Sequence, residues 1–131
     1  MAFAKAHGLA TPGRIEVPLD RAGAIAALEP EISAGQALGV ACYNDAVAIA
    51  VLAAGRDLGL AVPGQLSVMG VDATAEGQLV TPRLTTLSIE NGPVMDRIAA
   101  DLASLDRDGD VTTGALPNSP SPFSIIRGET T

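Results

Sequence analysis

Two charge-free apolar runs constrain this chain more than any other feature. The segments "LGVACY" (38–43) and "LSVMGV" (66–71) contain no charged residue. Continuous apolar runs of this length are typical of parallel strands that are buried on both faces of a sheet. Residues 44–60, which lie between the runs, repeat apolar side chains at helical spacing. The pattern therefore predicts a strand, a helix and a second strand.

The other expected elements alternate in the same way along the chain. Helices are expected over 2–7, 20–31 and 92–105, and strands over 14–19, from near Leu84 and over 123–127. The last two threonines are expected to be loose. Alternating helices and strands predict the α/β class, with a mainly parallel open sheet flanked by helices.

Composition narrows the classes of function. The chain has 131 residues, of which 47% are hydrophobic and only 2% aromatic, so one core of aliphatic side chains is expected. The net charge is −7 and Lys5 is the only lysine, which argues against a nucleic-acid or anionic-membrane surface. No 18-residue apolar run is present, so no membrane span is expected.

The residues that usually carry catalysis or bind metals are scarce. Cys42 and His7 are the only residues of their types, which excludes a disulfide framework and a cysteine-based zinc site. The segment "DRDGD" (106–110) resembles a calcium loop but lacks the required downstream glutamate. No phosphate-binding loop or nucleophile motif occurs. We therefore expect no enzyme activity, no metal and no cofactor.

Each buried-looking run ends in a polar side chain. Asn44 follows the first run and Asp72 follows the second. Ligands of open α/β sheets bind outside the carboxyl ends of the strands, so these two side chains could share one crevice. An amide and a carboxylate together suit a hydroxyl-rich or amine-bearing small molecule. The alternative is purely structural, with Asn44 capping a helix and Asp72 forming a turn.

The same residues carry a family resemblance. The stretch "YNDAVAIAVLAAGRDLGLAVPGQLSVMGVD" (43–72), followed by "PRLTTL" (82–87), resembles the effector-binding core of the lactose/galactose repressor (LacI/GalR) family. The ending "FSIIRGETT" is similar to the closing strand of that family. The resemblance implies a periplasmic-binding-protein-like type I fold with two lobes around a cleft. It assigns residues 1–90 and about 120–131 to the C-terminal lobe, and 91–107 to a helix of the other lobe.

The resemblance also implies site residues. Asn44 and Asp72 fall on positions that contact the effector in the family, usually a sugar or a nucleobase. Arg21 and Asn91 are two further expected ligand-binding residues. Ala73 stands where many relatives have a second aspartate.

The expected function is therefore effector sensing and dimerisation in a cytoplasmic transcriptional regulator. The helix from Asp45 and the segment around Val80 match regions that pair subunits in the family. The helix over 92–105 would pack on the other lobe in family members, so its apolar stripe needs another partner, and a homodimer or higher oligomer is expected. DNA contact is expected only through a helix-turn-helix domain that these 131 residues do not include. The alternatives are a solute-binding protein of a sugar transporter, or a truncated fragment without independent activity.

Overall fold

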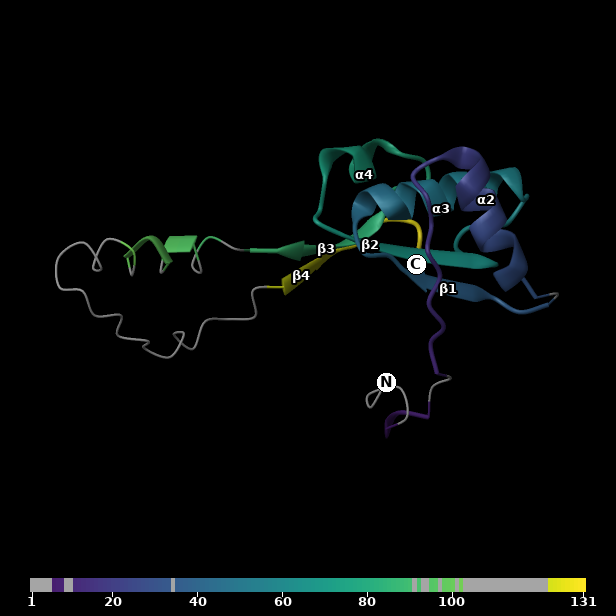
Figure 1. Ribbon diagram of the computed structural model, residues 1–131, viewed down its shortest axis with the longest axis horizontal. Helices are drawn as coiled ribbons and strands as arrows, with labels where there is room; N and C mark the ends of the chain where they lie inside the picture. The colour runs from purple at the N-terminus through teal and green to yellow at the C-terminus, as the bar shows by residue number, and fades with distance from the viewer. Residues whose placement is uncertain are drawn as a thin grey trace.

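The protein is built around a four-stranded sheet. Its structure is a computed structural model, which describes residues 6–8, 11–33, 35–90, 92, 95–96, 98–100, 102 and 123–131. The strands lie in the order β1-β2-β3-β4 (Figure 1). The first three are parallel and the last is antiparallel to its neighbour. Their bounds are Leu38–Ala41 for β1, Leu66–Val71 for β2, Thr85–Ile89 for β3 and Phe123–Ile126 for β4. The predicted α/β class with a mainly parallel sheet is confirmed.

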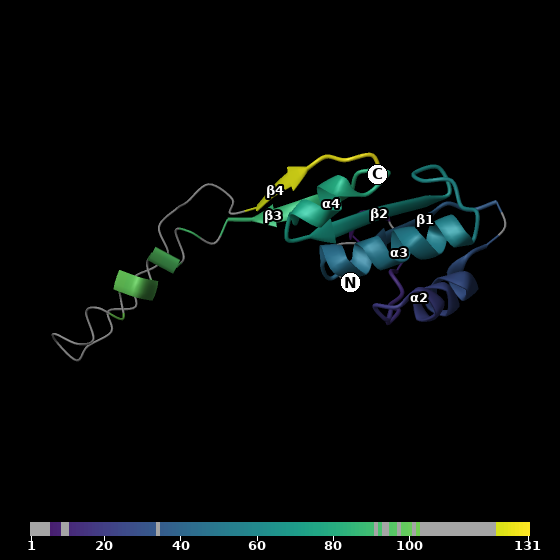
Figure 2. The same cartoon turned by 90° about the horizontal axis from the view of Figure 1, so that it is seen from above.

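The helices α2, α3 and α4 lie together on one side of this sheet (Figures 1 and 2). Their bounds are Arg21–Leu28 for α2, Asp45–Asp57 for α3 and Ala75–Leu79 for α4, and a short 3₁₀ turn, η1, covers Glu29–Glu31. Each helix begins after a residue whose side-chain oxygen accepts a backbone N–H of the first turn, which stabilises the start of the helix. These caps are Asp20, Asn44 and Thr74.

The core lies between α3 and the helix-facing side of the sheet. Along β2, Leu66, Val68 and Gly70 are buried and alternate with half-buried residues. Leu66 and Val68 pack in one cluster with Val51 and other aliphatic residues of α3. The absence of aromatic residues from this cluster agrees with the composition.

The second face of the sheet departs from expectation. The apolar runs predicted strands buried on both faces, but Gly39 and Ala41 of β1 are exposed on the side away from α3. Ile125 of β4 is 57% exposed. Among the residues that the structure describes, no helix covers this face. The apolar runs therefore predicted the strands correctly, but the predicted burial of both faces is correct for only one of them.

Two other expectations about the chain are wrong. The segment 14–19 is not a strand: a groove lined by both segments lies between residues 12–17 and β1, and Pro18 provides no N–H for a ladder. The final threonines are not loose, because Thr130 is fully buried and its hydroxyl donates to the Val68 carbonyl at 2.7 Å. Helix α4 was not expected. Most of the expected helix over 2–7 lies outside the described residues. Of the expected helix over 92–105, the described residues 92, 95–96, 98–100 and 102 are helical, and the rest lie outside the described residues.

One glycine sets how closely α3 approaches the sheet. Gly55 is buried in α3, and a Cβ at this position would overlap with Leu66 Cδ2. In an exposed helix, Gly→Ala stabilises by about 1 kcal/mol. We predict instead that Gly55→Ala lowers the free energy of unfolding by about 1–3 kcal/mol, the usual cost of overpacking a core. Urea denaturation measures this change.

A double-mutant cycle shows whether Leu66 is the cause. In a Leu66→Ala background, the added methyl group has room, so Gly55→Ala should cost much less there. An equal cost in both backgrounds would show that contact with Leu66 is not responsible.

Candidate functional site

The register of β1 and β2 indicates how the two predicted strand-end residues lie relative to each other. Leu38 pairs with Leu66 and Ala41 with Met69, so partners differ by 28 positions throughout (66 − 38 = 69 − 41 = 28). Continued past the ladder, the same offset places Asn44 opposite Asp72. Neighbouring strands lie about 4.8 Å apart. Asn44 and Asp72 therefore follow adjacent parallel strands at their carboxyl ends, as the sequence predicted.

Asn44 performs the structural role that the alternative reading assigned to it. It is the N-cap of α3, and its Oδ1 accepts a hydrogen bond from Val47 N at 2.9 Å. The residue is half-buried. This bond uses only the oxygen of the amide, and the two N–H donors of Nδ2 take no part in it. Capping and ligand binding are therefore compatible at this residue.

Asp72 begins an unusual turn. Its φ is 105° and that of Ala73 is 54°, a region that L-residues other than Asn, Asp and Gly rarely adopt. Asp72 N donates to Leu87 O at 2.9 Å, and Ala73 N donates to Thr86 Oγ1 at 3.2 Å. The Asp72 residue is exposed at the end of β2. The turn is thus fixed by β3, while Asp72 remains accessible to a ligand.

A buried carboxylate lies beneath this turn, and the sequence patterns did not predict it. Asp45, the first residue of α3, is fully buried. Its Oδ2 accepts from Thr74 N at 2.7 Å and from Thr74 Oγ1 at 3.0 Å, and its Oδ1 accepts from Thr86 Oγ1 at 2.5 Å. From the sequence, Asp45 was only the first residue of an expected helix. Its separation from Thr74 and Thr86 along the chain left no local signal for this role.

Cys42 lies next to this polar cluster and has no reactive character. Its side chain is buried, as expected of a small core residue. Burial, and to a smaller extent the charge of Asp45, raises the pKa of the Cys42 thiol to about 11. The thiol is therefore protonated at neutral pH. Among the described residues, no group of three His, Cys, Asp or Glu could hold a metal ion.

The structure does not bring Arg21 to Asn44 and Asp72. The Arg21 guanidinium binds both carboxylate oxygens of Asp57, at 2.5 and 2.6 Å. Asp57 is the last residue of α3, whereas Asn44 caps its first turn, and a helix of this length spans about 20 Å. Asn91, the other expected ligand-binding residue, lies outside the described residues.

Charge is distributed unevenly between the two ends of the sheet. Arg56 lies in the last turn of α3, Arg83 precedes β3, and Arg127 follows the antiparallel β4, so all three belong to the amino ends of the parallel strands. The carboxyl ends instead carry Asp72 and Glu90, which follow β2 and β3. This end offers hydrogen-bond acceptors, which suit hydroxyl or amine groups better than phosphate.

Comparisons with known proteins agree with this architecture. Residues 2–131 match the periplasmic binding protein-like domain family. The HTH-type transcriptional regulator GalR of Escherichia coli K12 is 44% identical over 48 residues, which are 37% of this chain and 14% of GalR.

Solved structures extend the similarity to nearly the whole chain. A structure described as a LacI-family transcriptional regulator from Sanguibacter keddieii DSM 10542 is 30% identical, with a TM-score of 0.66 over 96% of this chain and 49% of that one. A sugar-binding LacI-family regulator from Escherichia coli, solved with phosphate, is 25% identical, with a TM-score of 0.68 over 98% and 46%. The chain thus spans about half the length of these structures.

These matches first define the class: the chain belongs to the periplasmic binding protein-like domain family. Within this class it corresponds to the effector-binding domain of LacI/GalR-type transcriptional regulators, which confirms the resemblance noted in the sequence. The relatives named above are transcriptional regulators. No helix among the described residues is long and apolar enough to cross a membrane.

The ion pair between Arg21 and Asp57 makes stability depend on pH. The hydrogen bond from Arg21 holds the pKa of Asp57 below its ordinary value of 3.8. Because the folded-state pKa is the lower one, the pair stabilises the fold fully above the unfolded-state pKa and loses this effect as pH falls through the folded-state pKa. We predict that stability falls less steeply for Asp57→Asn than for the wild type from about pH 5 downward.

Thermal unfolding between about pH 6 and pH 2.5 measures this difference. Glu29→Gln, which removes an exposed carboxylate from η1, is the matched control and should follow the wild-type profile. Coincident profiles for Asp57→Asn and the wild type would show that the pair does not couple stability to pH.

Proposed function

We propose that this chain senses a neutral, hydroxyl-rich small molecule, most simply a sugar, at the carboxyl ends of β1 and β2. The parallel register of β1 and β2 supports this most strongly, because its continuation by three residues would place Asn44 level with Asp72. A LacI-family relative from Escherichia coli is itself described as sugar-binding. In such a regulator the effector alters DNA binding by a helix-turn-helix domain, and we place the protein in the cytoplasm, where regulators meet DNA.

The chemistry of the two side chains is complementary. The Asp72 carboxylate only accepts hydrogen bonds, and the free part of the Asn44 amide only donates them. A hydroxyl group does both, so adjacent hydroxyls of one sugar ring satisfy both residues. A carboxylate or phosphate group can accept from Asn44 but is repelled by Asp72. Arg21 and Asn91 remain proposed ligand contacts. Arg21 would have to leave its ion pair with Asp57 to reach a ligand, and Asn91 lies outside the described residues.

A solute-binding role in transport is not favoured, because the relatives are transcriptional regulators. The further alternative, a fragment without independent activity, would be recognised by the absence of binding to every compound in the test below. We propose a binding role and no catalysis, since the relatives are transcriptional regulators.

Two conservative substitutions test the site. Asn44→Asp keeps a good N-cap but removes both amide donors, and Asp72→Asn keeps the shape but removes the charge. We predict that Asp72→Asn weakens the affinity for the sugar that binds best by about tenfold or more, since hydrogen bonds to charged groups contribute about 1.5–3 kcal/mol. Asn44→Asp should weaken it by about threefold to tenfold, since hydrogen bonds between neutral groups contribute about 0.5–1.5 kcal/mol. Isothermal titration calorimetry with D-galactose, D-glucose and lactose measures this affinity.

Charged analogues in the same titration test the ligand class. D-galacturonate and galactose 1-phosphate should bind more weakly than D-galactose, and Asp72→Asn should narrow the difference by removing the repulsion. Glu29→Gln is the control and should bind like the wild type. Wild-type affinity in both Asn44→Asp and Asp72→Asn would remove these residues from the site.

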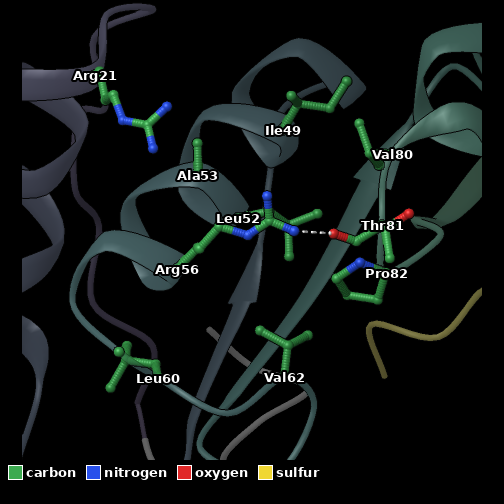
Figure 3. Close-up of a pocket in the computed structure, with 11 residues that line it drawn as sticks. Arg21, Ile49, Leu52, Ala53, Arg56, Leu60, Val62, Val80, Thr81 and Pro82 are labelled. Carbon is green, nitrogen blue, oxygen red and sulfur yellow. Dashed lines mark hydrogen bonds between the residues drawn. The ribbon is translucent and has the colours of Figure 1, made fainter.

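A groove on the outer surface of α3 supports the proposed pairing of subunits. It has a volume of about 540 Å³ and lies between α3 and residues 80–82 (Figure 3). Most of its lining is apolar, including Ile49, Leu52 and Val80. Arg56 Nη2 donates to Thr81 O at 2.9 Å and joins the two walls. The resemblance to family members assigns these same two segments to dimer contacts, so we propose a second copy of the chain as the occupant.

A charge placed in the groove tests this surface. Ile49 is half-buried and lines the groove, so Ile49→Glu should keep the fold while preventing an apolar contact between subunits. We predict that the wild type sediments as a dimer and Ile49→Glu as a monomer of 13.2 kDa. Ala26→Glu adds the same charge at an exposed position of α2 and should remain dimeric. A wild-type monomer at all concentrations would contradict the proposal.

A further inference from the structure

We propose that Asp45 is the positioning residue of the strand-end site, whose buried carboxylate holds the 72–74 turn against α3 and so sets Asp72 beside Asn44. The effect on ligand binding rests on the function proposed above. The restraint of the turn by Asp45 does not depend on the proposed function, because it is a property of the protein without ligand. The two parts can therefore fail separately.

The hydrogen bonds around Asp45 connect three elements. Asp45 begins α3, Thr74 ends the turn and caps α4, and Thr86 belongs to β3. Thr74 reaches Asp45 Oδ2 through both its backbone N–H and its hydroxyl, at 2.7 and 3.0 Å. Thr86 reaches Oδ1 through its hydroxyl at 2.5 Å. One carboxylate thus ties the start of a helix to the far end of the turn and to the neighbouring strand.

Thr86 passes the restraint on to the middle of the turn. While its hydroxyl donates to Asp45, the same oxygen accepts from Ala73 N at 3.2 Å. Ala73 and Asp72 are the two residues other than glycine with positive φ in the described part of the chain. Such conformations persist only where the surrounding contacts determine them. Asp45 holds Thr74 directly and Ala73 through Thr86, so the turn that carries Asp72 is restrained at consecutive residues.

Two glycines leave space for this carboxylate. A Cβ at Gly70 would overlap with Asp45 Oδ1, and one at Gly77 would lie 3.2 Å from Oδ2. Both glycines are buried. A side chain at either position would press on the carboxylate. The space left by these glycines therefore fits a carboxylate that accepts three hydrogen bonds. Asp45, which follows Asn44 in the chain, occupies this space.

Nuclear magnetic resonance of the ligand-free protein tests the first part. In Asp45→Ala, we expect chemical-shift-derived φ angles at Asp72 and Ala73 to leave the positive range. The hydrogen-exchange protection of the Thr74 amide should fall by at least about tenfold. Thr86→Val keeps the size of the side chain but removes the hydroxyl, and should release Ala73 in the same way. Asp45→Asn, which retains one acceptor oxygen, should restore part of the protection of Thr74.

A destabilised control separates positioning from general loss of stability. Gly55→Ala disturbs the core away from the turn, and urea denaturation shows whether its stability loss is comparable. It should leave the φ angles of Asp72 and Ala73 unchanged. Unchanged φ angles in both Asp45→Ala and Thr86→Val would overturn the proposal, as would the same change in Gly55→Ala.

Titration with D-galactose tests the second part. If Asp45 positions the site, Thr86→Val should lose about tenfold or more in affinity while its fold remains intact, and Gly55→Ala should bind like the wild type. A released turn with wild-type affinity would overturn the link between Asp45 and the ligand. If Asp72→Asn also binds like the wild type, Asp72 is not part of the ligand site and the proposed function is contradicted. The φ angles of Asp72 and Ala73 then decide whether Asp45 holds the turn.

Discussion

The parallel pairing of β1 with β2, joined by α3, is the constraint on which the rest of the structure depends. Two parallel strands cannot be joined by a tight turn, so the chain must cross back over the sheet, and α3 makes this crossing. The same register buries Leu66 and Val68 against α3, and its continuation would set Asn44 opposite Asp72. A shift by one residue would turn both sets of side chains to the wrong side. Packing and site geometry are thus fixed together.

This coupling is reinforced by polar contacts at one end and by close packing at the other. At the carboxyl ends, Asp45 joins α3 to the turn after β2 and to β3. Toward the other end of α3, Gly55 lets the helix approach Leu66 closely. A helix fixed at both ends has little freedom to slide along the sheet. The N-cap at Asn44 is therefore held at a constant position relative to β2, which a hydrogen-bonding site needs.

The sequence predicted those features that depend on local pattern. Uninterrupted apolar residues indicated β1 and β2 correctly, and the polar residue after each run marked the candidate site. Contacts between distant residues escaped prediction. Thr130 resembles part of a solvated tail, yet it is buried because Val68 O and Thr85 N, far away in the chain, need a partner. Asp45 likewise resembles a surface charge in the sequence. Its three hydrogen-bond donors come from Thr74 and Thr86, which are distant in the chain and reach it only in the folded protein.

Arg21 shows a second contact between distant residues that the sequence did not predict. Its partner Asp57 lies 36 residues away, and no local pattern announces an ion pair at that separation. The pairing also has a consequence for recognition. Arg21 is held beside the last residue of α3, so its guanidinium lies away from Asn44, which caps the first turn of that helix.

The double use of Asn44 finally narrows what the site can recognise. Capping α3 uses one lone pair of the amide oxygen and neither hydrogen of Nδ2, so Asn44 approaches a ligand mainly as a donor, while Asp72 approaches it only as an acceptor. A ligand that bridges them must therefore offer an acceptor and a donor within one short span. A carboxylate or phosphate lacks the donor, and an ammonium group lacks the acceptor. A hydroxyl group has both, and neighbouring hydroxyls on a sugar ring repeat them at a spacing that two adjacent strands can match. The capping requirement of a helix thus becomes a selectivity rule for its ligand.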